Sequence, residues 1–331
     1  MSDLPSSVGL LGAGRMGRGI ALSFALAGTK SILIDLKERS AEQFAAMAAA
    51  IRAEMEADLG FLAEVGLFDA QHVSRIADRI SLVSAAGAAE SVVQIPLFFE
   101  GVPEVLPAKQ ACLEWASLHA GPDAIIASTT STILVDDLAG FVTHPERFVN
   151  AHWLNPAHLM PLVEVSHGNF TSAATTERLV AWLEAAGKVP VRMKASPGYI
   201  VPRIQALAMN EAARMVEEGV ATAEDIDKAV KVGFGLRFAV LGLAEFIDWG
   251  GGDILYYADR YLCKTLDKDR FKTPKIIEDN MHNQRNGLRD GVGFYDYRDM
   301  DVAAYRKSRM ADFIGMLKYL ELAPKPDVST S

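Results

Sequence analysis

The chain is poor in cysteine. It has only Cys112 and Cys263 among 331 residues, far apart in sequence and without the close spacing of paired metal ligands. Two such thiols exclude a disulfide framework and give no sign of a metal site. We therefore expect both cysteines to be reduced and mostly buried, no bound metal, and a cytoplasmic location.

Basic charge and long apolar runs are scarce as well. Lysine and arginine number 33 against 42 aspartates and glutamates, for a net charge of −9, and the basic residues form no clustered stripe. Nucleic acids and anionic membranes are bound by many clustered cations, so we expect neither as a partner. No apolar window is long enough to cross a bilayer, and the chain starts without the basic and apolar regions of a secretory signal.

What the chain does have is length and apolar content. With 331 residues, 50% of them apolar, it can bury a substantial core but exceeds the usual size of one domain. We therefore expect two domains, residues 1–195 and residues 196–331. The boundary lies near residues 194–197, after which helical periodicity replaces the strand signals.

Three glycines follow the first apolar run. Residues 8–17 read VGLLGAGRMG, and a helix-compatible segment continues from there. In a turn between a strand and a helix, the first glycine allows a tight bend, the second lets the backbone approach a pyrophosphate, and the third permits close packing of helix on strand. The residues that we expect at a bound dinucleotide are Gly12, Ala13, Gly14, Arg15, Met16 and Gly17.

An acid after the second apolar run indicates that the dinucleotide is NAD. Asp35 lies 18 residues beyond Gly17. Near that distance an acid meets the adenine ribose, where it hydrogen-bonds the hydroxyl groups and repels a 2′-phosphate. Lys37 and Arg39 follow closely and leave NADP open as the alternative.

Strand and helix patterns alternate around this motif. Apolar runs typical of strands occur at residues 31–34, 80–83, 92–99, 124–128, 147–154, 162–166 and 189–193. Helical patterns lie at residues 38–58, 69–78, 104–119 and 175–186. This alternation is typical of an α/β fold, so we expect a Rossmann-type doubly wound sheet followed by an all-helical C-terminal domain.

A base, an amide and a carboxylate lie within residues 150–165, which read NAHWLNPAHLMPLVEV. His152, Asn155 and Glu164 accompany two short apolar runs that look like neighbouring strands. A neutral imidazole can take a proton from an alcohol near pH 7 when a carboxylate holds its other nitrogen. Glu164 is the expected holder of His152, although a histidine between two strands can also be a purely structural residue.

Five segments of the chain occur in a recognisable order. They are GAGRMGRGIA, STTS at residues 128–131, the segment with His152, Asn155, Pro156 and Glu164, then SPGYIVPR and EDIDKAV. Together they resemble the L-3-hydroxyacyl-CoA dehydrogenase family, including the separation of twelve residues between histidine and glutamate. The resemblance spans nearly the whole chain and implies an NAD-dependent oxidoreductase of fatty acid metabolism.

The resemblance also implies roles for residues around the reacting group. His152 is then the base that removes the hydroxyl proton, and Glu164 orients it. Ser131 and Asn155 then contact the substrate carbonyl region and the nicotinamide. Both residues are therefore expected to be catalytic and to bind the cofactor, and Ser131 is also expected to bind the substrate.

Three further residues lie along the cofactor if the resemblance holds: Glu104, Lys109 and Arg289. Each has an ordinary alternative. Glu104 could be a first-turn acid that favours its helix, Lys109 a solvated surface charge, and Arg289 a loop cation before Gly291.

Departures from the family pattern concern the substrate. Pro202 stands where the acyl-CoA enzymes carry an asparagine, and the helix after Asp35 is acidic, with Arg52 as its only cation. Residues 233–242, GFGLRFAVLG, look more like lambda-crystallin (gulonate dehydrogenase) and carnitine dehydrogenase, which oxidise free hydroxy acids. Arg237 could then pair with a substrate carboxylate, or it could be a surface or dimer-interface cation.

The first expectation is therefore reversible oxidation of a short-chain L-3-hydroxyacyl-CoA, similar to 3-hydroxybutyryl-CoA, to the 3-keto form. A free hydroxy acid is the second reading, and a catalytically idle, crystallin-like NAD-binding protein is the third. We also expect a homodimer built by the second domain, because its apolar faces exceed what one small helical domain can cover. These faces include Ile204, Leu207, Ala208, Ala212 and residues 238–247.

Overall fold

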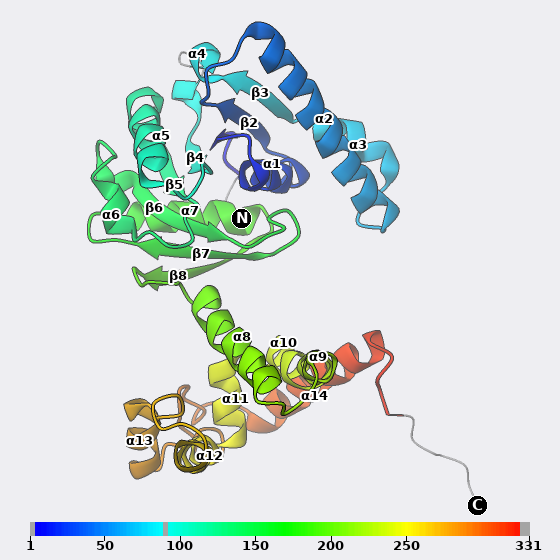
Figure 1. Cartoon of the computed structure of the whole chain (residues 1–331), viewed down its shortest axis with the longest axis vertical. Coiled ribbons are helices and arrows are strands. Elements are labelled where there is room, and N and C mark those ends of the chain that lie inside the picture. Colours follow the sequence, from blue (N-terminus) through cyan, green and yellow to red (C-terminus); the bar gives the residue numbers. More distant parts are fainter. Residues whose placement is uncertain (1–3, 89–91, 325–331) are drawn as a thin grey trace, which may run out of the picture. The chain divides into compact units, whose positions relative to one another are not determined.

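The computed structural model describes residues 4–88 and 92–324 (Figure 1). The chain divides into two compact units, residues 1–207 and residues 208–331. One helix, α8 (Val201–Glu217), crosses this division. The domain boundary near residues 194–197 therefore stays a prediction.

The first unit is built on one eight-stranded sheet in the order β3-β2-β1-β4-β5-β6-β7-β8. All neighbouring strands run parallel except β6 and β7, which are antiparallel. The strands are β1 (Ser7–Leu11), β2 (Lys30–Asp35), β3 (Ile80–Ser84), β4 (Leu97–Glu100), β5 (Ile125–Ser128), β6 (Phe148–Trp153), β7 (Leu162–His167) and β8 (Val189–Lys194). This sheet confirms the Rossmann-type fold.

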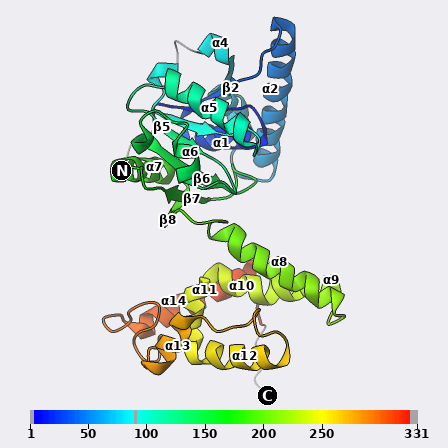
Figure 2. The same ribbon diagram turned by 60° about the vertical axis from the view of Figure 1, so that its left-hand side comes forward.

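Helices cover both faces of the sheet (Figures 1 and 2). Side chains of α1 (Arg15–Ala27), α2 (Ala41–Glu64), α3 (Val73–Ala77) and α7 (Ala173–Ala185) pack in one apolar core. Those of α4 (Ala85–Ala88), α5 (Leu106–His119) and α6 (Val135–Ala139) pack in the other. The short turns are η1 (Ala70–His72), η2 (Val92–Gln94) and η3 (Pro145–Arg147).

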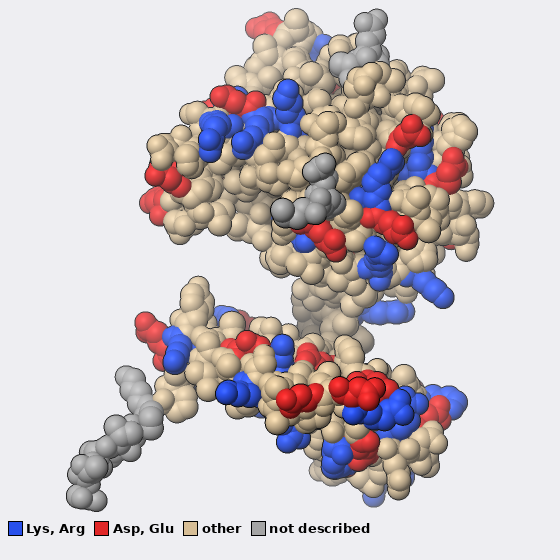
Figure 3. All heavy atoms as spheres, turned by 180° about the vertical axis from the view of Figure 1, so that it is seen from behind, with Lys and Arg blue, Asp and Glu red and all other residues tan. Residues whose placement is uncertain are grey.

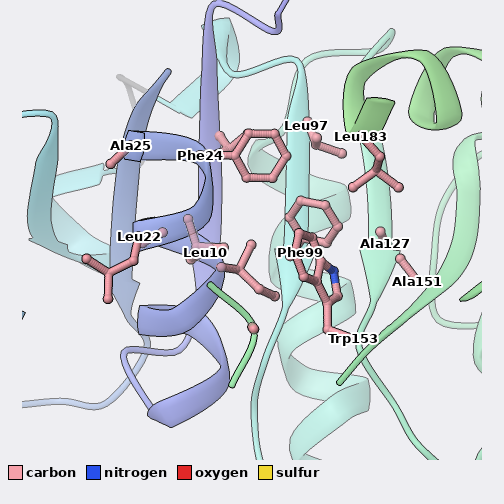
Figure 4. Packing of buried hydrophobic residues seen from close by; sticks show 14 of the residues in the cluster. Leu10, Leu22, Phe24, Ala25, Leu97, Phe99, Ala127, Ala151, Trp153 and Leu183 are labelled. Carbon is pink, nitrogen blue, oxygen red and sulfur yellow. The ribbon is translucent and has the colours of Figure 1, made fainter. Parts of the chain in front are cut away.

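Three aromatic side chains of the first core fix the strands that carry the site. Phe99 and Trp153 meet edge to face with ring centroids 5.6 Å apart, and Phe24 of α1 lies 5.8 Å from Phe99 (Figure 4). Successive side chains of a strand point to opposite faces of the sheet. Glu100 follows Phe99 and His152 precedes Trp153, so both polar residues point toward the α5 side.

Proline residues account for the late start of two expected elements. The predicted strand over residues 92–99 is a turn at η2 followed by β4, because Pro96 lacks the amide that a strand needs. The helix predicted from residue 104 begins at Leu106, with Pro107 in its first turn. Glu104 is therefore not a first-turn acid, and that alternative is wrong.

The second unit is helical, as expected. It contains the rest of α8, then α9 (Ala223–Ala229), η4 (Val230–Phe234), α10 (Gly235–Val240), α11 (Leu243–Gly250), α12 (Gly252–Thr265), α13 (Lys275–His282) and α14 (Val302–Tyr319). The buried carboxylate of Asp248 holds the loop before α14, because it accepts the amides of Phe294 and Tyr295 and the hydroxyl of Tyr297.

The cysteines, the lengths of the helices and the surface charges complete the description. Cys112 and Cys263 are free thiols; Cys112 is buried and Cys263 is partly exposed. Within residues 4–88 and 92–324, the structure has no helix of sufficient length and apolar character to span a membrane. On the face seen in Figure 3, lysine and arginine side chains lie among acidic ones.

Candidate active site

The antiparallel pairing of β6 and β7 places His152 directly opposite Glu164. The Nδ1 atom of His152 lies 2.8 Å from Oε2 of Glu164, and both side chains are buried. The expected pair is therefore brought together by the strand register. Sequence reasoning anticipated neighbouring strands, whereas the antiparallel direction of β7 is known only from the structure.

The second carboxylate oxygen of Glu164 is also held. Oε1 accepts the backbone amides of Ile200 at 2.8 Å and Val201 at 2.9 Å, at the start of α8. Burial alone would raise the pKa of Glu164, but the hydrogen bonds from His152 and from these amides outweigh it and lower the pKa. An ionised Glu164 accepts hydrogen bonds only, so Nδ1 of His152 donates and Nε2 keeps its lone pair.

The glycine turn has the shape that a pyrophosphate requires. Gly12 has a positive φ of 105°, and a Cβ on Gly17 would lie 2.1 Å from the carbonyl oxygen of Gly12. Gly14 is the N-cap residue just before α1, and among the described residues no side chain caps that first turn. The first amides of α1 are thus available for an anion, so the residues present fit the phosphates of a dinucleotide.

Asp35 is a buried carboxylate at the end of β2. It accepts a hydrogen bond from Nε of Arg39 at 2.6 Å and a longer one from the amide of Lys37 at 3.4 Å. Arg39, which left NADP open, is therefore paired with the acid that favours NAD.

Glu104 organises the turn after β5. Its Oε1 accepts the hydroxyl of Thr130, the amide of Ser131 at 3.1 Å, and both the amide and the hydroxyl of Thr132. Burial raises the pKa of Glu104, but the hydroxyls of Thr130 and Thr132 and the ammonium of Lys109 lower it to about 2. The ionised carboxylate thereby fixes the backbone that carries Ser131.

Lys109 is 1% exposed, so the alternative of a solvated surface charge is wrong. Its Nζ lies 3.0 Å from Oε2 of Glu104 and 3.0 Å from both oxygens of Glu100. Glu100 also accepts the hydroxyl of Ser128 at 2.5 Å. Sequence reasoning missed Glu100, although an acid ending the apolar strand LFFE nine residues before Lys109 was an available signal.

These residues meet at one edge of the sheet. Strands β1, β2, β4, β5 and β6 are parallel, so their carboxyl ends lie along the same edge. The glycine turn follows β1, the turn of Ser131 follows β5, and Asn155 follows β6 by two residues. Ser131 and Asn155 are both exposed there.

Arg237 and Arg289 belong to the second unit. The guanidinium of exposed Arg237 lies 5.7 Å from the ring centre of Phe246. Arg289 pairs with Asp253 at 3.1 Å and with Asp290 at 3.4 Å. The part of both arginines in the site stays a prediction.

Three charged residues of α2, Arg52, Glu54 and Glu56, form ion pairs. Arg52 bonds to Glu56 at 2.5 Å and to Asp78 at 2.8 Å, and Arg18 of α1 pairs with Glu54. Beside Arg52 lies a hollow of about 190 Å³ lined largely by apolar residues of β2, α2, α3 and β3. Arg52, the single cation of α2, is therefore neutralised.

A doubly wound sheet with a glycine turn, a buried acid at the end of β2 and a buried histidine–carboxylate pair defines a dinucleotide-dependent dehydrogenase. Residues 7–196 match the family model of the 3-hydroxyacyl-CoA dehydrogenase NAD binding domain, and residues 198–297 match that of the C-terminal domain. The chain belongs to the 3-hydroxyacyl-CoA dehydrogenase family, and it is an NAD-dependent oxidoreductase that acts on a CH–OH group.

Relatives in this family differ in the substrates that their names give. A probable 3-hydroxybutyryl-CoA dehydrogenase of Bacillus subtilis is 30% identical over 87% of this chain and 96% of its own length. The 5-formyl-3-hydroxy-2-methylpyridine 4-carboxylate 5-dehydrogenase of Mesorhizobium japonicum is 28% identical over 95% of this chain and 98% of its own. The crystal structure of a 3-hydroxyacyl-CoA dehydrogenase from Archaeoglobus fulgidus shares 30% identity with a TM-score of 0.76, covering 96% of this chain and 99% of that one.

Proposed function

We propose that the chain oxidises the hydroxyl of a short-chain L-3-hydroxyacyl-CoA, similar to 3-hydroxybutyryl-CoA, to the 3-keto form, and that the reaction is reversible. The observation that carries the proposal is the 2.8 Å hydrogen bond between His152 and Glu164. It leaves Nε2 of a neutral imidazole as a base beside the edge of the sheet where the glycine turn lies. The names of the Bacillus and Archaeoglobus relatives support the acyl-CoA substrate.

In this mechanism His152 removes the hydroxyl proton onto Nε2, and Glu164 stabilises the imidazolium that forms. The hydroxyl of Ser131 and the amide of Asn155 polarise the substrate oxygen on which negative charge develops. NAD, when bound, supplies the acceptor for the hydride that leaves the carbon atom bearing this hydroxyl. In the reverse direction the protonated His152 returns its proton to the ketone oxygen.

Residues of both units would hold the cofactor. The residues of the glycine turn, Gly12 to Gly17, would bind the pyrophosphate through backbone amides, and Asp35 would bind the adenine ribose. Glu104 and Lys109 would act through the turn that they hold in place, and Arg289 would act from the second unit.

A free hydroxy acid is the second candidate, favoured by the charges of α2. A CoA thioester brings phosphates, yet Arg18 and Arg52 are already paired with carboxylates. Pro202 has neither a side-chain donor nor an amide to offer a substrate. The name of the Mesorhizobium relative describes a pyridine carboxylate rather than a thioester. In this case Arg237 would pair with the substrate carboxylate.

Turnover by the purified protein with NAD separates the candidates. We expect 3-hydroxybutyryl-CoA to be oxidised faster than free 3-hydroxybutyrate, carnitine or gulonate, and Arg237→Ala to leave its KM nearly unchanged. If a free acid is preferred, Arg237→Ala should raise the KM for that acid by about tenfold or more, because a charge-assisted pair is lost. The control is Arg306→Ala, which changes another exposed arginine of the second unit and should leave this KM unchanged. Bound NAD without turnover of any of these substrates would favour the idle protein.

We further propose a cytoplasmic homodimer formed through the predicted second domain, residues 196–331, which includes all of α8. No residue of α8, all of which the structure describes, is buried, and Leu207 is 70% exposed. Exposed apolar surface of this kind marks interfaces. We expect light scattering to give twice the 35.8 kDa of one chain. A monomer at micromolar concentration would contradict the dimer.

A further inference from the structure

Tyr199 lies face to face with His152. It sits between β8 and α8, is 4% exposed, and its ring stacks on the imidazole with centroids 4.6 Å apart and planes 20° from parallel. An aromatic face in this position restricts rotation of the imidazole about its side-chain bonds. It also attracts positive charge, so it favours the imidazolium over a neutral ring.

The hydroxyl of Tyr199 is tied to two other parts of the first unit. It donates to the carbonyl oxygen of Thr130 at 2.9 Å and accepts from Nδ2 of Asn150 at 3.2 Å. Burial raises the pKa of Tyr199, so its hydroxyl stays protonated and keeps donating. Thr130 precedes Ser131, and Asn150 lies two residues before His152 on the same face of β6. The ring is thereby fixed relative to both.

The backbone of this turn reaches the other member of the pair. Gly198 and Tyr199 have positive φ angles of 76° and 49°, and a left-handed conformation is uncommon for tyrosine. It is followed directly by the amides of Ile200 and Val201, which bind Glu164. One turn thus supports His152 through a ring and Glu164 through two amides, and strained backbone of this kind is concentrated at functional sites.

We infer that Tyr199 is a positioning residue, which holds the His152 ring in the plane that aims Nε2 at the substrate hydroxyl and stabilises its protonated form. The inference rests on the proposed role of His152 as the base. The tyrosine ring acts through His152, and the tyrosine hydroxyl keeps that ring aligned with the turn that carries Ser131.

Two variants separate the ring from the hydroxyl. Tyr199→Phe keeps the stacked ring but removes both hydrogen bonds of the hydroxyl. We expect kcat with 3-hydroxybutyryl-CoA to fall about three- to tenfold, which is within the range that losing two hydrogen bonds can produce. Tyr199→Leu removes the stack, so kcat should fall further and the acid limb of the pH profile of kcat/KM should move to lower pH. Histidine NMR of ¹⁵N-labelled protein should show the same shift in the titration of His152, without any substrate.

The matched control is Tyr297→Phe in the second unit. Tyr297 is also 4% exposed, and its substitution by phenylalanine removes one buried hydrogen bond, the one to Asp248 at 3.1 Å. It should lower thermal stability and leave kcat and the His152 titration unchanged. NAD affinity should stay the same in all three variants, which shows that the first unit is folded.

The outcomes separate this inference from the proposed function. If His152→Gln abolishes turnover while Tyr199→Leu keeps the wild-type kcat and His152 titration, Tyr199 is not a positioning residue. If His152→Gln itself turns over normally, the proposed base is wrong and the inference falls with it. If Tyr199→Leu lowers kcat without moving the titration of His152, its effect is only structural and the inference is overturned.

Discussion

Arg39 donates through Nε to the carboxylate of Asp35 at 2.6 Å, at the end of β2. The acid that we propose to bind the adenine ribose therefore also pairs with the guanidinium of Arg39. As long as Asp35 is present, a 2′-phosphate would meet a carboxylate, and the positive charge of Arg39 is already compensated.

We expect NAD to be strongly preferred over NADP and Asp35→Ser to reduce this preference about tenfold or more. The substitution removes the repulsive carboxylate and releases Arg39 to bind a 2′-phosphate. The measurement is kcat/KM with each cofactor. Asp35→Ser/Arg39→Ala is the control, and it should not gain activity with NADP. An unchanged cofactor ratio in Asp35→Ser would show that Asp35 does not select the cofactor.

Gly17→Ala should weaken NAD binding about tenfold or more. The new Cβ would lie 2.1 Å from the carbonyl oxygen of Gly12, so the turn must shift away from the shape that holds a pyrophosphate. Gly60→Ala is the matched control in α2, because its Cβ meets no atom within 4 Å. It should bind NAD normally and melt at an equal or higher temperature. Normal NAD titration of Gly17→Ala would contradict this assignment of the turn.

Lys188 gives a prediction on pH. Its Nζ donates to the carbonyl oxygens of Ala157 at 2.8 Å and Met160 at 3.0 Å, in the loop after Asn155. Burial lowers the pKa of Lys188 to about 8, below its value of about 10.4 in an unfolded chain. The unfolded state thus binds this proton more tightly. Below about pH 8 the buried charge of Lys188 destabilises the folded state to its full extent, and this destabilisation disappears as the pH rises from 8 toward 10.

The Tm of wild type should therefore rise by a few degrees relative to that of Lys188→Met between about pH 7.5 and pH 10. Thermal melts at several pH values measure the difference. Lys30→Met, which changes an exposed lysine of β2, should show a constant difference over the same range. A constant difference for Lys188→Met as well would mean that Lys188 is not buried as a charge.

Much of the first unit follows from local pattern. The glycine turn and Asp35 are predictable because a strand, a tight bend and a helix lie consecutively in the chain. His152 and Glu164 are predictable as neighbours because each lies in a short apolar run. The antiparallel direction of β7 is not predictable in this way, because strand pairing depends on how distant segments pack rather than on the sequence of either strand alone.

Other parts of the site depend on long-range contacts that a local pattern does not reveal. The sequence shows that Glu100 ends an apolar strand, but only the fold shows that Lys109 and Ser128 both contact it. Tyr199 reads as a loop residue in SPGY, and its left-handed backbone and its stack on His152 follow from tertiary packing. The amides on Glu164 are hidden for the same reason.

Turnover by His152→Gln tests most directly whether His152 is the base. We expect kcat to fall by about 10²- to 10⁴-fold, the contribution of a positioned general base, while the Kd for NAD stays within twofold of wild type. Glu164→Gln should also be slow, because the imidazole then loses its orienting charge. A His152→Gln variant that oxidises its substrate at the wild-type rate would contradict the central claim.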